Sequence, residues 1–377
     1  MMREQALPLA DKRPALLSRI PWHALAMVGA LVAIWIALSL ATHGTFLLPR
    51  NLSQLARQMS VTSVLAIGMV MVIVAGQIDL SVGALAGLLG AISAMAFVDR
   101  GWPLWASVLV TLLLGALIGL VQGNLVAWLG IPPFIVTLGG MLVFQGTLLG
   151  ITGGVSISPT RPYLYVGQSY LPNTLGWICT GLICAWLLFQ ALRSKGTARW
   201  RALVLLGMAL VFTGVMNAYE GIPLPVLLVV VLAAFFSGVT NHTPFGRHLY
   251  AIGGNREAAF YSGIRIERHI IGVFTLMGVL CGAAGIVLTA RVGSATSDAG
   301  RMMELDAIAA AVIGGTSLLG GQGTVWGALL GALVMASLDN GMGLLNTESF
   351  WQPIIKGSIL ILAVGVDMAI RRSRGRA

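Results

Sequence analysis

The segment Trp22-His-Ala-Leu-Ala-Met-Val-Gly-Ala-Leu-Val-Ala-Ile-Trp-Ile-Ala-Leu-Ser-Leu40 decides the fold class, because it is apolar and carries no formal charge. It has about the length, near 20 residues, that an α-helix needs to cross a bilayer. Comparable stretches recur as far as Val364. Of the 377 residues, 57% are hydrophobic and 10% are charged, with a mean hydropathy of +0.89. So few ionisable side chains cannot cover a water-soluble globule of this size. The sequence therefore predicts an all-α polytopic membrane protein.

The formal charge of +10 comes largely from four clusters of basic residues. These are Arg3, Lys12, Arg13 and Arg19; Arg193, Lys195, Arg199 and Arg201; Arg247, Arg256, Arg265 and Arg268; and Arg371, Arg372, Arg374 and Arg376. Basic residues in short loops are retained on the cytoplasmic side of a membrane. The charge is therefore interpreted as a topology signal, and no nucleic-acid partner is expected.

About 12 spans place all four clusters on the cytoplasmic side, starting from an N-terminus inside. The predicted spans are 21–41, 54–76, 81–98, 104–128, 134–151, 174–192, 201–217, 222–241, 269–290, 304–318, 324–344 and 351–369. Residues 1–377 then form a single transmembrane domain with two cytoplasmic tails, 1–20 and 370–377. The segment 304–318 is the weakest span, because it opens with two carboxylates and ends in glycines. It either crosses or forms a half-helix, and the parity of the basic clusters favours a crossing.

Two loops are long enough to have a function of their own, an outer one at about 152–173 and an inner one at 242–268. In the inner loop, Asn255 to Ser262 has the signals of a short helix: Asn255 as cap, Glu257 near the positive end and Gly263 as stop. This pattern favours a docking element on the cytoplasmic face over a merely solvated loop.

Three motifs that mark common enzyme sites are absent from the sequence. It contains no Gly-x-x-x-x-Gly-Lys-Ser/Thr phosphate loop, no His-Glu-x-x-His and no Gly-x-Ser-x-Gly. The three cysteines, Cys179, Cys184 and Cys281, lie in apolar segments without metal-ligand spacing. No catalytic residue, metal site or cofactor is therefore expected in this chain.

The polar residues that interrupt apolar spans are the candidates for a translocation path, because ionisable groups at membrane depth are costly. Gln77, Asp79 and Ser81 lie in a break between two apolar spans. Asp79 is either a helix cap or a group beside a conduit, and the two roles are compatible. Further candidates are Asn124, Gln145, Glu304, Asp306 and Asn340. Helix packing remains the alternative for the amides, and an interfacial cap neutralised by Arg291 and Arg301 remains the alternative for the two acids.

A faint internal echo links two such breaks. Gly76-Gln77 and Gly321-Gln322 both follow an apolar span and precede a helix rich in small residues. Duplicated breaks of this kind can mark a transport pathway at a repeat interface.

Several motifs together resemble one family, the permease subunits of bacterial ABC importers for monosaccharides (the ribose, arabinose, galactose and xylose group). They are Gln77-Ile-Asp-Leu-Ser-Val-Gly, Pro133-Phe-Ile-Val-Thr-Leu-Gly, Tyr250-Ala-Ile-Gly-Gly-Asn, Glu257-Ala-Ala with Ser262-Gly-Ile, and Glu304-Leu-Asp-Ala-Ile-Ala-Ala with Ile313-Gly-Gly-Thr-Ser-Leu. The inserted hydrophobic pair near 174–217 resembles the xylose-type members, beside a ten-span core. Gln77 departs from the family, which usually has glutamate there, and this puts in doubt any role that needs an acid at that position.

The resemblance implies a subunit without covalent chemistry that passes a neutral monosaccharide, D-xylose by subgroup, through the bacterial inner membrane. It implies a second permease subunit in a homodimer, a periplasmic sugar-binding protein, and a cytoplasmic ATPase with two nucleotide-binding halves that holds ATP and Mg. It also implies that residues of the inner loop dock on this ATPase. These are Phe245, Gly246, Arg247, Gly253, Gly254, Asn255, Glu257, Ala258, Ala259 and Gly263.

Other functions stay open from the sequence. One is a secondary sugar carrier driven by an ion gradient, for which Asp79, Glu304 and Asp306 are the candidate ion-binding acids. A second is an importer permease for ribose, arabinose or galactose. A third is a membrane scaffold or sensor without transport activity.

Overall fold

The structure is a computed structural model that describes residues 22–193 and 196–374, and this part of the chain is a bundle of helices. The first half contains α1 (Trp22–Ala41), the 3-10 helix η2 (Thr45–Leu47), α2 (Pro49–Val74), α3 (Val82–Val98), α4 (Leu104–Ala127), α5 (Pro133–Thr152), α6 (Arg161–Gln168), β1 (Tyr170–Leu171) and α7 (Asn173–Arg193). The second half contains α8 (Thr197–Asn217), β2 (Ile222–Pro223), α9 (Leu224–His242), α10 (Pro244–Gly254), α11 (Arg256–Tyr261), α12 (Ile266–Val292), α13 (Met303–Ile313), α14 (Val325–Leu344) and α15 (Trp351–Arg374).

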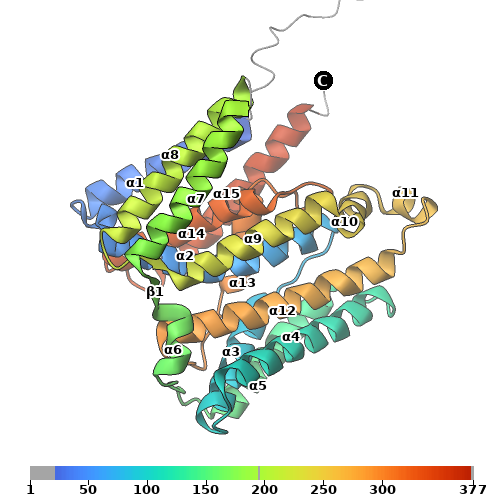
Figure 1. Ribbon diagram of the computed structural model, residues 1–377. Coiled ribbons are helices and arrows are strands. Elements are labelled where there is room, and N and C mark those ends of the chain that lie inside the picture. The colour runs from blue at the N-terminus through green and yellow to red at the C-terminus, as the bar shows by residue number, and fades with distance from the viewer. Residues whose placement is uncertain (1–21, 194–195, 375–377) are drawn as a thin grey trace, which may run out of the picture.

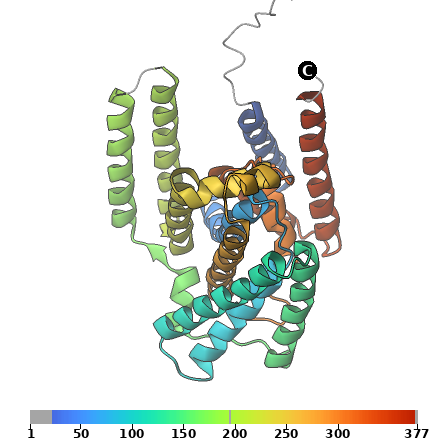
Figure 2. The ribbon, with the colours of Figure 1, turned by 90° about the vertical axis from the view of Figure 1, so that its right-hand side faces the viewer.

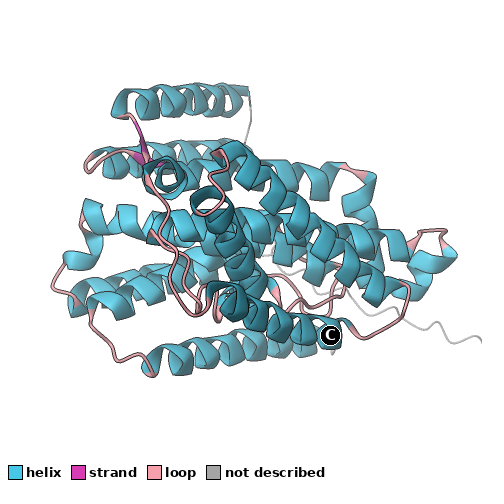
Figure 3. Cartoon of the chain, turned by 90° about the horizontal axis from the view of Figure 1, so that it is seen from below, coloured by secondary structure: helices cyan, strands magenta, loops and turns pink. Residues whose placement is uncertain are grey.

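The helices α9 and α12 run between two ends of the bundle (Figure 1). One end carries α10 and α11 and is called the α10 end. The other carries α6, β1 and β2 and is called the α6 end, where β1 and β2 pair antiparallel. The helix α12 extends between the two ends, beside α4, and the view from below shows the long helices lengthwise (Figure 3). Such a bundle positions its loops at two opposite faces, as a polytopic membrane protein requires.

Burial divides the apolar helices into a centre and a periphery. In α2, 83% of the most apolar window is buried, whereas in α4 and α5 the corresponding shares are 22% and 17%. Both groups are hydrophobic, so the peripheral helices present apolar side chains outward, which suits a lipid environment. Among the described residues, eight helices are long and apolar enough to cross a membrane, and α1, α3 and α15 contain shorter apolar segments. The polytopic, all-α class is thereby confirmed.

The predicted inserted pair is present as α7 and α8, which form a hairpin at one side of the bundle (Figure 2). The hydroxyl oxygens of Thr180 and Thr213 lie 2.6 Å apart between these two helices. The pair therefore adds to the bundle without interrupting its centre.

The predicted spans agree with helices to within five residues at each end, and α15 continues to Arg374, beyond the predicted end at 369 and into the predicted basic tail. The second span begins at Pro49 instead of residue 54, because proline suits the first turn of a helix. The outer loop contains α6, which the sequence did not predict, and its Tyr163 is fully buried against Phe97 and Ile286. The predicted tail 1–20 and residues 375–377 of the basic tail lie outside the described residues.

The segment predicted as the span 304–318 is a half-helix. The helix α13 has 11 residues, about 16 Å of rise, whereas the hydrocarbon core is about 30 Å thick. The chain nevertheless passes from one end of the bundle to the other. Ala295 pairs with Ile157 of the outer loop, and Gly321 donates its N–H to the carbonyl of Val74 near α10. A non-helical segment of the chain and the half-helix α13 together replace a continuous spanning helix. The chain therefore crosses here without a full helix, as the parity of the basic clusters predicted.

The helices α4 and α12 cross in close backbone contact. A Cβ atom placed on Gly278 would lie 2.0 Å from the carbonyl oxygen of Gly115, and one placed on Gly115 would lie 2.3 Å from that of Gly278. The small-residue spacing in the sequence thus serves close backbone approach.

We expect the substitution Gly278→Ala to destabilise the protein by about 1–3 kcal/mol, because the two backbones must separate. Thermal unfolding of the detergent-solubilised chain measures this loss. The matched control is Gly146→Ala on α5, where nothing lies within 4 Å of the added Cβ. An equal melting temperature for Gly278→Ala and the control would contradict the prediction.

Candidate functional site

The break between α2 and α3 is held by a chain of buried side-chain hydrogen bonds. Oδ1 of Asp79 accepts the backbone N–H of Ser81 at 2.8 Å and its hydroxyl at 2.7 Å. Gln122 of α4 donates from Nε2 to Oγ of Ser81 at 3.0 Å. Asp79 is 1% exposed, so its carboxylate is enclosed by protein. Asp79 therefore organises the entry to α3 from two residues before Ser81, which occupies the N-cap position.

Gln77 has a local role in the same break. Its Nε2 donates to the carbonyl of Ala75 at 3.3 Å, and its backbone N–H bonds to Val72 at 3.0 Å. The side chain is 5% exposed. The amide therefore satisfies main-chain groups where the helix ends, which a glutamate could not do by donating.

The carboxylate of Glu304 lies against α3. Glu304 is 8% exposed, and a Cβ on Gly83 would lie 2.4 Å from its Oε2. This oxygen has no hydrogen-bond partner among the described residues. Glu304 is thus a buried acid at the contact between the two short central helices.

A buried ion-pair network joins α13, α14 and α15. Nζ of Lys356 lies 2.9 Å from Oδ2 of Asp306 and 2.9 Å from Oδ1 of Asp339. The expected neutralisation of the α13 acids by Arg291 and Arg301 is wrong. Arg301 instead pairs with Asp298 at 3.5 Å, where both side chains are mostly exposed. Lys356 pairs with the carboxylates of Asp306 and Asp339. It comes from α15, which is far from Asp306 in the sequence and packs beside it in the fold.

The other three amides predicted for the path have different surroundings. Asn340 and Asn51 exchange two side-chain hydrogen bonds, at 2.8 and 3.1 Å, and so join α14 to α2. Asn124 donates to the carbonyl of Leu120 in its own helix at 2.7 Å. Gln145 is partly buried on α5. The structure therefore groups Gln77, Asp79 and Ser81 in one place and Glu304 and Asp306 in another, and leaves these amides apart.

Two polar residues of the centre were missed in the sequence, Lys356 and Gln122. Each is a polar residue within a predicted apolar span, 351–369 and 104–128 respectively. Such a residue is by itself a signal of a buried partner.

The second candidate site is the pair of helices at the α10 end (Figure 1). Oδ1 of Asn255 accepts the N–H of Ala258 at 2.9 Å and caps α11, and Gly263 follows with φ 80°. The predicted short helix is thereby confirmed. The preceding α10 was not predicted, and its cap is Thr243, whose Oγ1 accepts the N–H of Gly246 at 3.3 Å.

The residues predicted for docking divide into an outer and an inner set. Those exposed at the α10 end are Arg247, Gly254, Asn255, Glu257, Ala258 and Gly263. Those wholly or partly buried against the bundle are Phe245, Gly246, Gly253 and Ala259. Phe260 and Tyr261, which are 62% and 85% exposed, extend the outer set with two aromatic rings. Exposed aromatic side chains of this kind are typical of binding hot spots.

The inner face of α10 contacts the breaks of the bundle directly. A Cβ on Gly253 would lie 1.8 Å from the carbonyl oxygen of Val74, the last residue of α2. The hydroxyl of Tyr250 donates to the carbonyl of Gly323 at 2.7 Å. Burial raises the pKa of Tyr250, so the phenol remains a protonated donor at neutral pH. The helix therefore rests on the ends of both breaks that form the internal echo.

Two histidines add a contact between α10 and α12. Nδ1 of His248 lies 3.0 Å from Nε2 of His269, and the ring of Phe245 stacks on His269 with centroids 5.6 Å apart. These rings fix the start of α10 against the first turns of α12.

An apolar helical bundle with a half-helix, enclosed polar breaks and an exposed helix pair defines a membrane transport subunit. The chain belongs to the family described as branched-chain amino acid transport system / permease component, whose model matches residues 51–364. It is a permease subunit and not an enzyme.

Individual relatives support this assignment. The xylose transport system permease protein XylH of Escherichia coli (strain K12) is 45% identical over 362 residues, covering 92% of each chain. The protein of that name from Haemophilus influenzae is 43% identical over 362 residues, covering 92% of this chain and 96% of that one. The ribose import permease protein RbsC of Escherichia coli (strain K12) is 37% identical over 343 residues, covering 90% and 92%. No solved structure matches the chain.

We expect Lys356→Met to destabilise the protein by about 3–5 kcal/mol, because two buried carboxylates lose their shared cation. Adding Asp306→Asn and Asp339→Asn to this variant restores much of the loss. Thermal unfolding in detergent measures both. The control is Arg301→Ala, which breaks an exposed pair and costs less than about 1 kcal/mol. Wild-type stability of Lys356→Met would show that the network does not hold α13.

Proposed function

We propose that this chain is the membrane-spanning permease subunit of an ATP-driven importer that moves a neutral monosaccharide, D-xylose, into the cytoplasm. Two relatives with 45% and 43% identity over nearly their full lengths are named xylose transport system permease proteins, which supports this substrate over ribose. A neutral sugar also suits a bundle whose few central charges are paired or enclosed.

The observation that carries the proposal is the exposed helix pair α10–α11. Its outer set joins a carboxylate at Glu257 to two protruding rings at Phe260 and Tyr261, and its inner set contacts the ends of both breaks. A surface of this form suits the docking of an ATPase whose movements are transmitted to the helices of the bundle. Residues 242–268 are accordingly the coupling loop of this single-domain permease, and the α10 end is cytoplasmic, with both termini.

The partners follow from this assignment. Two copies of the chain surround the path, a periplasmic protein delivers the sugar, and a cytoplasmic ATPase with two nucleotide-binding halves binds ATP and Mg. The chain has no phosphate loop of its own, so the nucleotide chemistry takes place on that ATPase. Nucleotide binding there biases the permease between inward-open and outward-open states.

The path itself is proposed to adjoin the central breaks. Two short helices, α3 and α13, lie next to these breaks and lack full spanning length. Gln77, Asp79 and Ser81 directly precede α3, and Glu304 and Asp306 lie in the first turn of α13. Asn124, Gln145 and Asn340 are proposed only as residues of its wider surroundings.

The ion-driven carrier is less well supported. Asp79 accepts two hydrogen bonds from Ser81, and Asp306 is paired with Lys356. Of the three candidate acids, Glu304 and Asp306 each retain one carboxylate oxygen without a hydrogen-bond partner among the described residues. A cation site usually requires several oxygen ligands.

We expect reconstituted chain, with binding protein and ATPase, to accumulate xylose only when ATP is supplied. Labelled xylose uptake into proteoliposomes measures this, with ribose, arabinose and galactose as competitors. Uptake that persists without ATP and stops when an ion gradient is dissipated would identify a secondary carrier. No stimulated uptake of any of the four sugars would favour a scaffold or sensor.

We expect Glu257→Lys and Gly254→Trp to lower xylose uptake at least about tenfold while membrane insertion is unchanged, because both alter the docking surface. Gly254 has open space around its Cβ position, so the tryptophan fits the folded chain. ATPase association, measured by co-purification, falls in parallel.

Two matched variants control for folding. Glu348→Lys makes the same charge change in an exposed residue between α14 and α15 and leaves uptake unchanged. Gly253→Val lowers the melting temperature, because its Cβ would meet the Val74 carbonyl. Normal uptake by both docking variants would remove the coupling assignment.

A further inference from the structure

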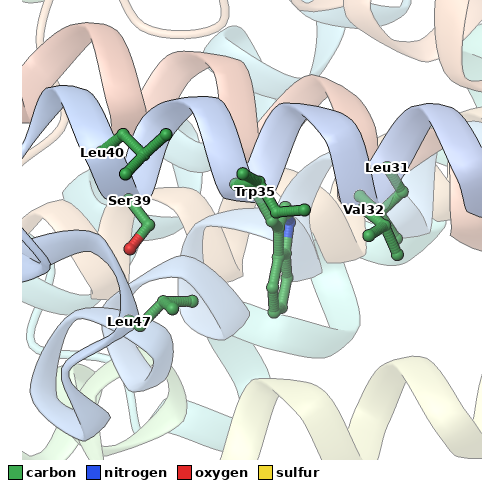
Figure 4. A pocket seen from close by; sticks show the side chains of 7 residues that line it. Leu31, Val32, Trp35, Ser39, Leu40 and Leu47 are labelled. Carbon is green, nitrogen blue, oxygen red and sulfur yellow. The ribbon is translucent and has the colours of Figure 1, made fainter.

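Two cavities lie next to each other at the junction of α1 and α2. The first is an apolar groove of about 440 Å³, lined by Leu31, Val32, Trp35, Ile36, Ser39, Leu40 and Leu47 (Figure 4). The second is a polar cavity of about 550 Å³, lined by Thr45, Leu48, Arg50, Asn51, Gln54, Arg57, Tyr219 and Leu344. The short segment 45–48 contributes residues to both cavities. The groove and the polar cavity are therefore adjoining parts of one surface.

The polar cavity is cationic. Arg57 donates from Nη2 to Oε1 of Gln54 at 2.6 Å, and its guanidinium lies 5.3 Å from the ring centre of Tyr170. Its Nε is buried without an acceptor. Neither Arg50 nor Arg57 forms an ion pair with an acid in the described part of the chain. The cavity thus has two positive charges and donor groups for an anion.

The position of the cavity fixes its level in the membrane. Four helices end beside it: α1 at Ala41, α2 at Pro49, α8 at Asn217 and α14 at Leu344. Helix ends, arginine and tyrosine are typical of the layer in which lipid headgroups lie. The groove follows the body of α1, at the level of the acyl chains.

The groove is open and apolar. Val32, Ile36 and Leu40 are 50%, 56% and 75% exposed. The indole of Trp35 is fixed by a hydrogen bond from Nε1 to Oγ of Ser337 at 3.0 Å. A rigid apolar wall that leads to a cationic cavity complements a molecule with a hydrocarbon chain and an anionic head.

We propose that this surface binds one glycerophospholipid, with its phosphate on Arg50 and Arg57 and an acyl chain in the groove beside α1. The phosphate receives charge-assisted hydrogen bonds from both guanidinium groups. An acidic patch of a soluble protein would match the arginines but would leave the groove unfilled, so a lipid accounts for more of the surface. The proposal does not depend on which sugar is transported.

The test is native mass spectrometry of the full-length chain in detergent, titrated with phosphatidylglycerol. Diacylglycerol with the same acyl chains and inorganic phosphate are the comparison probes. We expect the double variant Arg50→Gln/Arg57→Gln to bind phosphatidylglycerol about tenfold more weakly than the wild-type chain. Ile36→Trp, which narrows the groove and keeps both arginines, also weakens binding. Arg161→Gln changes an exposed arginine of α6 outside both cavities and leaves binding unchanged.

The outcomes are distinct. Weaker binding of phosphatidylglycerol by both test variants, with weak binding of diacylglycerol throughout, supports the proposal. Unchanged affinity in either test variant overturns it, as does displacement of the lipid by millimolar inorganic phosphate. Loss of binding-protein association with unchanged lipid affinity would show a protein docking site instead. If the double variant melts at a lower temperature, Ile36→Trp decides the question alone.

Discussion

The structure depends on one constraint: a backbone polar group inside the hydrocarbon layer must have a hydrogen-bond partner within the protein. Two non-helical segments of the chain, about 75–81 and 314–324, lie among buried helices, so each must satisfy its own main chain. The N–H of Gly321 donates to Val74 at 2.9 Å, and the N–H of Ser317 donates to Gln322 at 2.9 Å. Asp79 accepts the N–H of Ser81. Such breaks are tolerated only in the interior, and α2, which ends at the first break, is the most buried of the candidate spans.

The same constraint governs the charged side chains. Lys356 places one positive charge between Asp306 and Asp339, and so joins the half-helix α13 to the two helices that follow it. A half-helix has fewer apolar contacts than a full span and needs another means of being held in place. A buried ion pair adds little net stability compared with apolar packing, but breaking it is costly. The network therefore fixes the position of α13 more than it raises the overall stability.

The fold class and most spans were predictable from the sequence, because a run of about 20 apolar residues has the length and composition of a membrane-spanning helix. The helix α11 was predictable from its capping residues, whereas α10 was not, since Gly246, Gly253 and Gly254 weaken a helix pattern. The Arg291 and Arg301 pairing was wrong because it assumed that neighbours in the sequence are neighbours in space. Lys356 lies 50 residues beyond Asp306, and only the packing of α15 against α13 brings them together. Patterns of neighbouring residues therefore predicted the individual helices. They did not predict contacts between residues that are far apart in the sequence, which depend on how the helices pack.

The internal echo, the similarity of the breaks at Gly76-Gln77 and Gly321-Gln322, can be explained by the position of α10. The carbonyl of Val74, the last residue of α2 before the first break, contacts Gly253 of α10. The carbonyl of Gly323 in the second break accepts a hydrogen bond from the hydroxyl of Tyr250, also on α10. Both breaks end on the same surface helix, so a displacement of that helix bears on α3 and α14 together, through the segments that precede them. A continuous pair of spans could not respond in this way, because its backbone is already bonded within each helix. The breaks are thus the places where a force at the α10 end can alter the interior with the fewest lost hydrogen bonds.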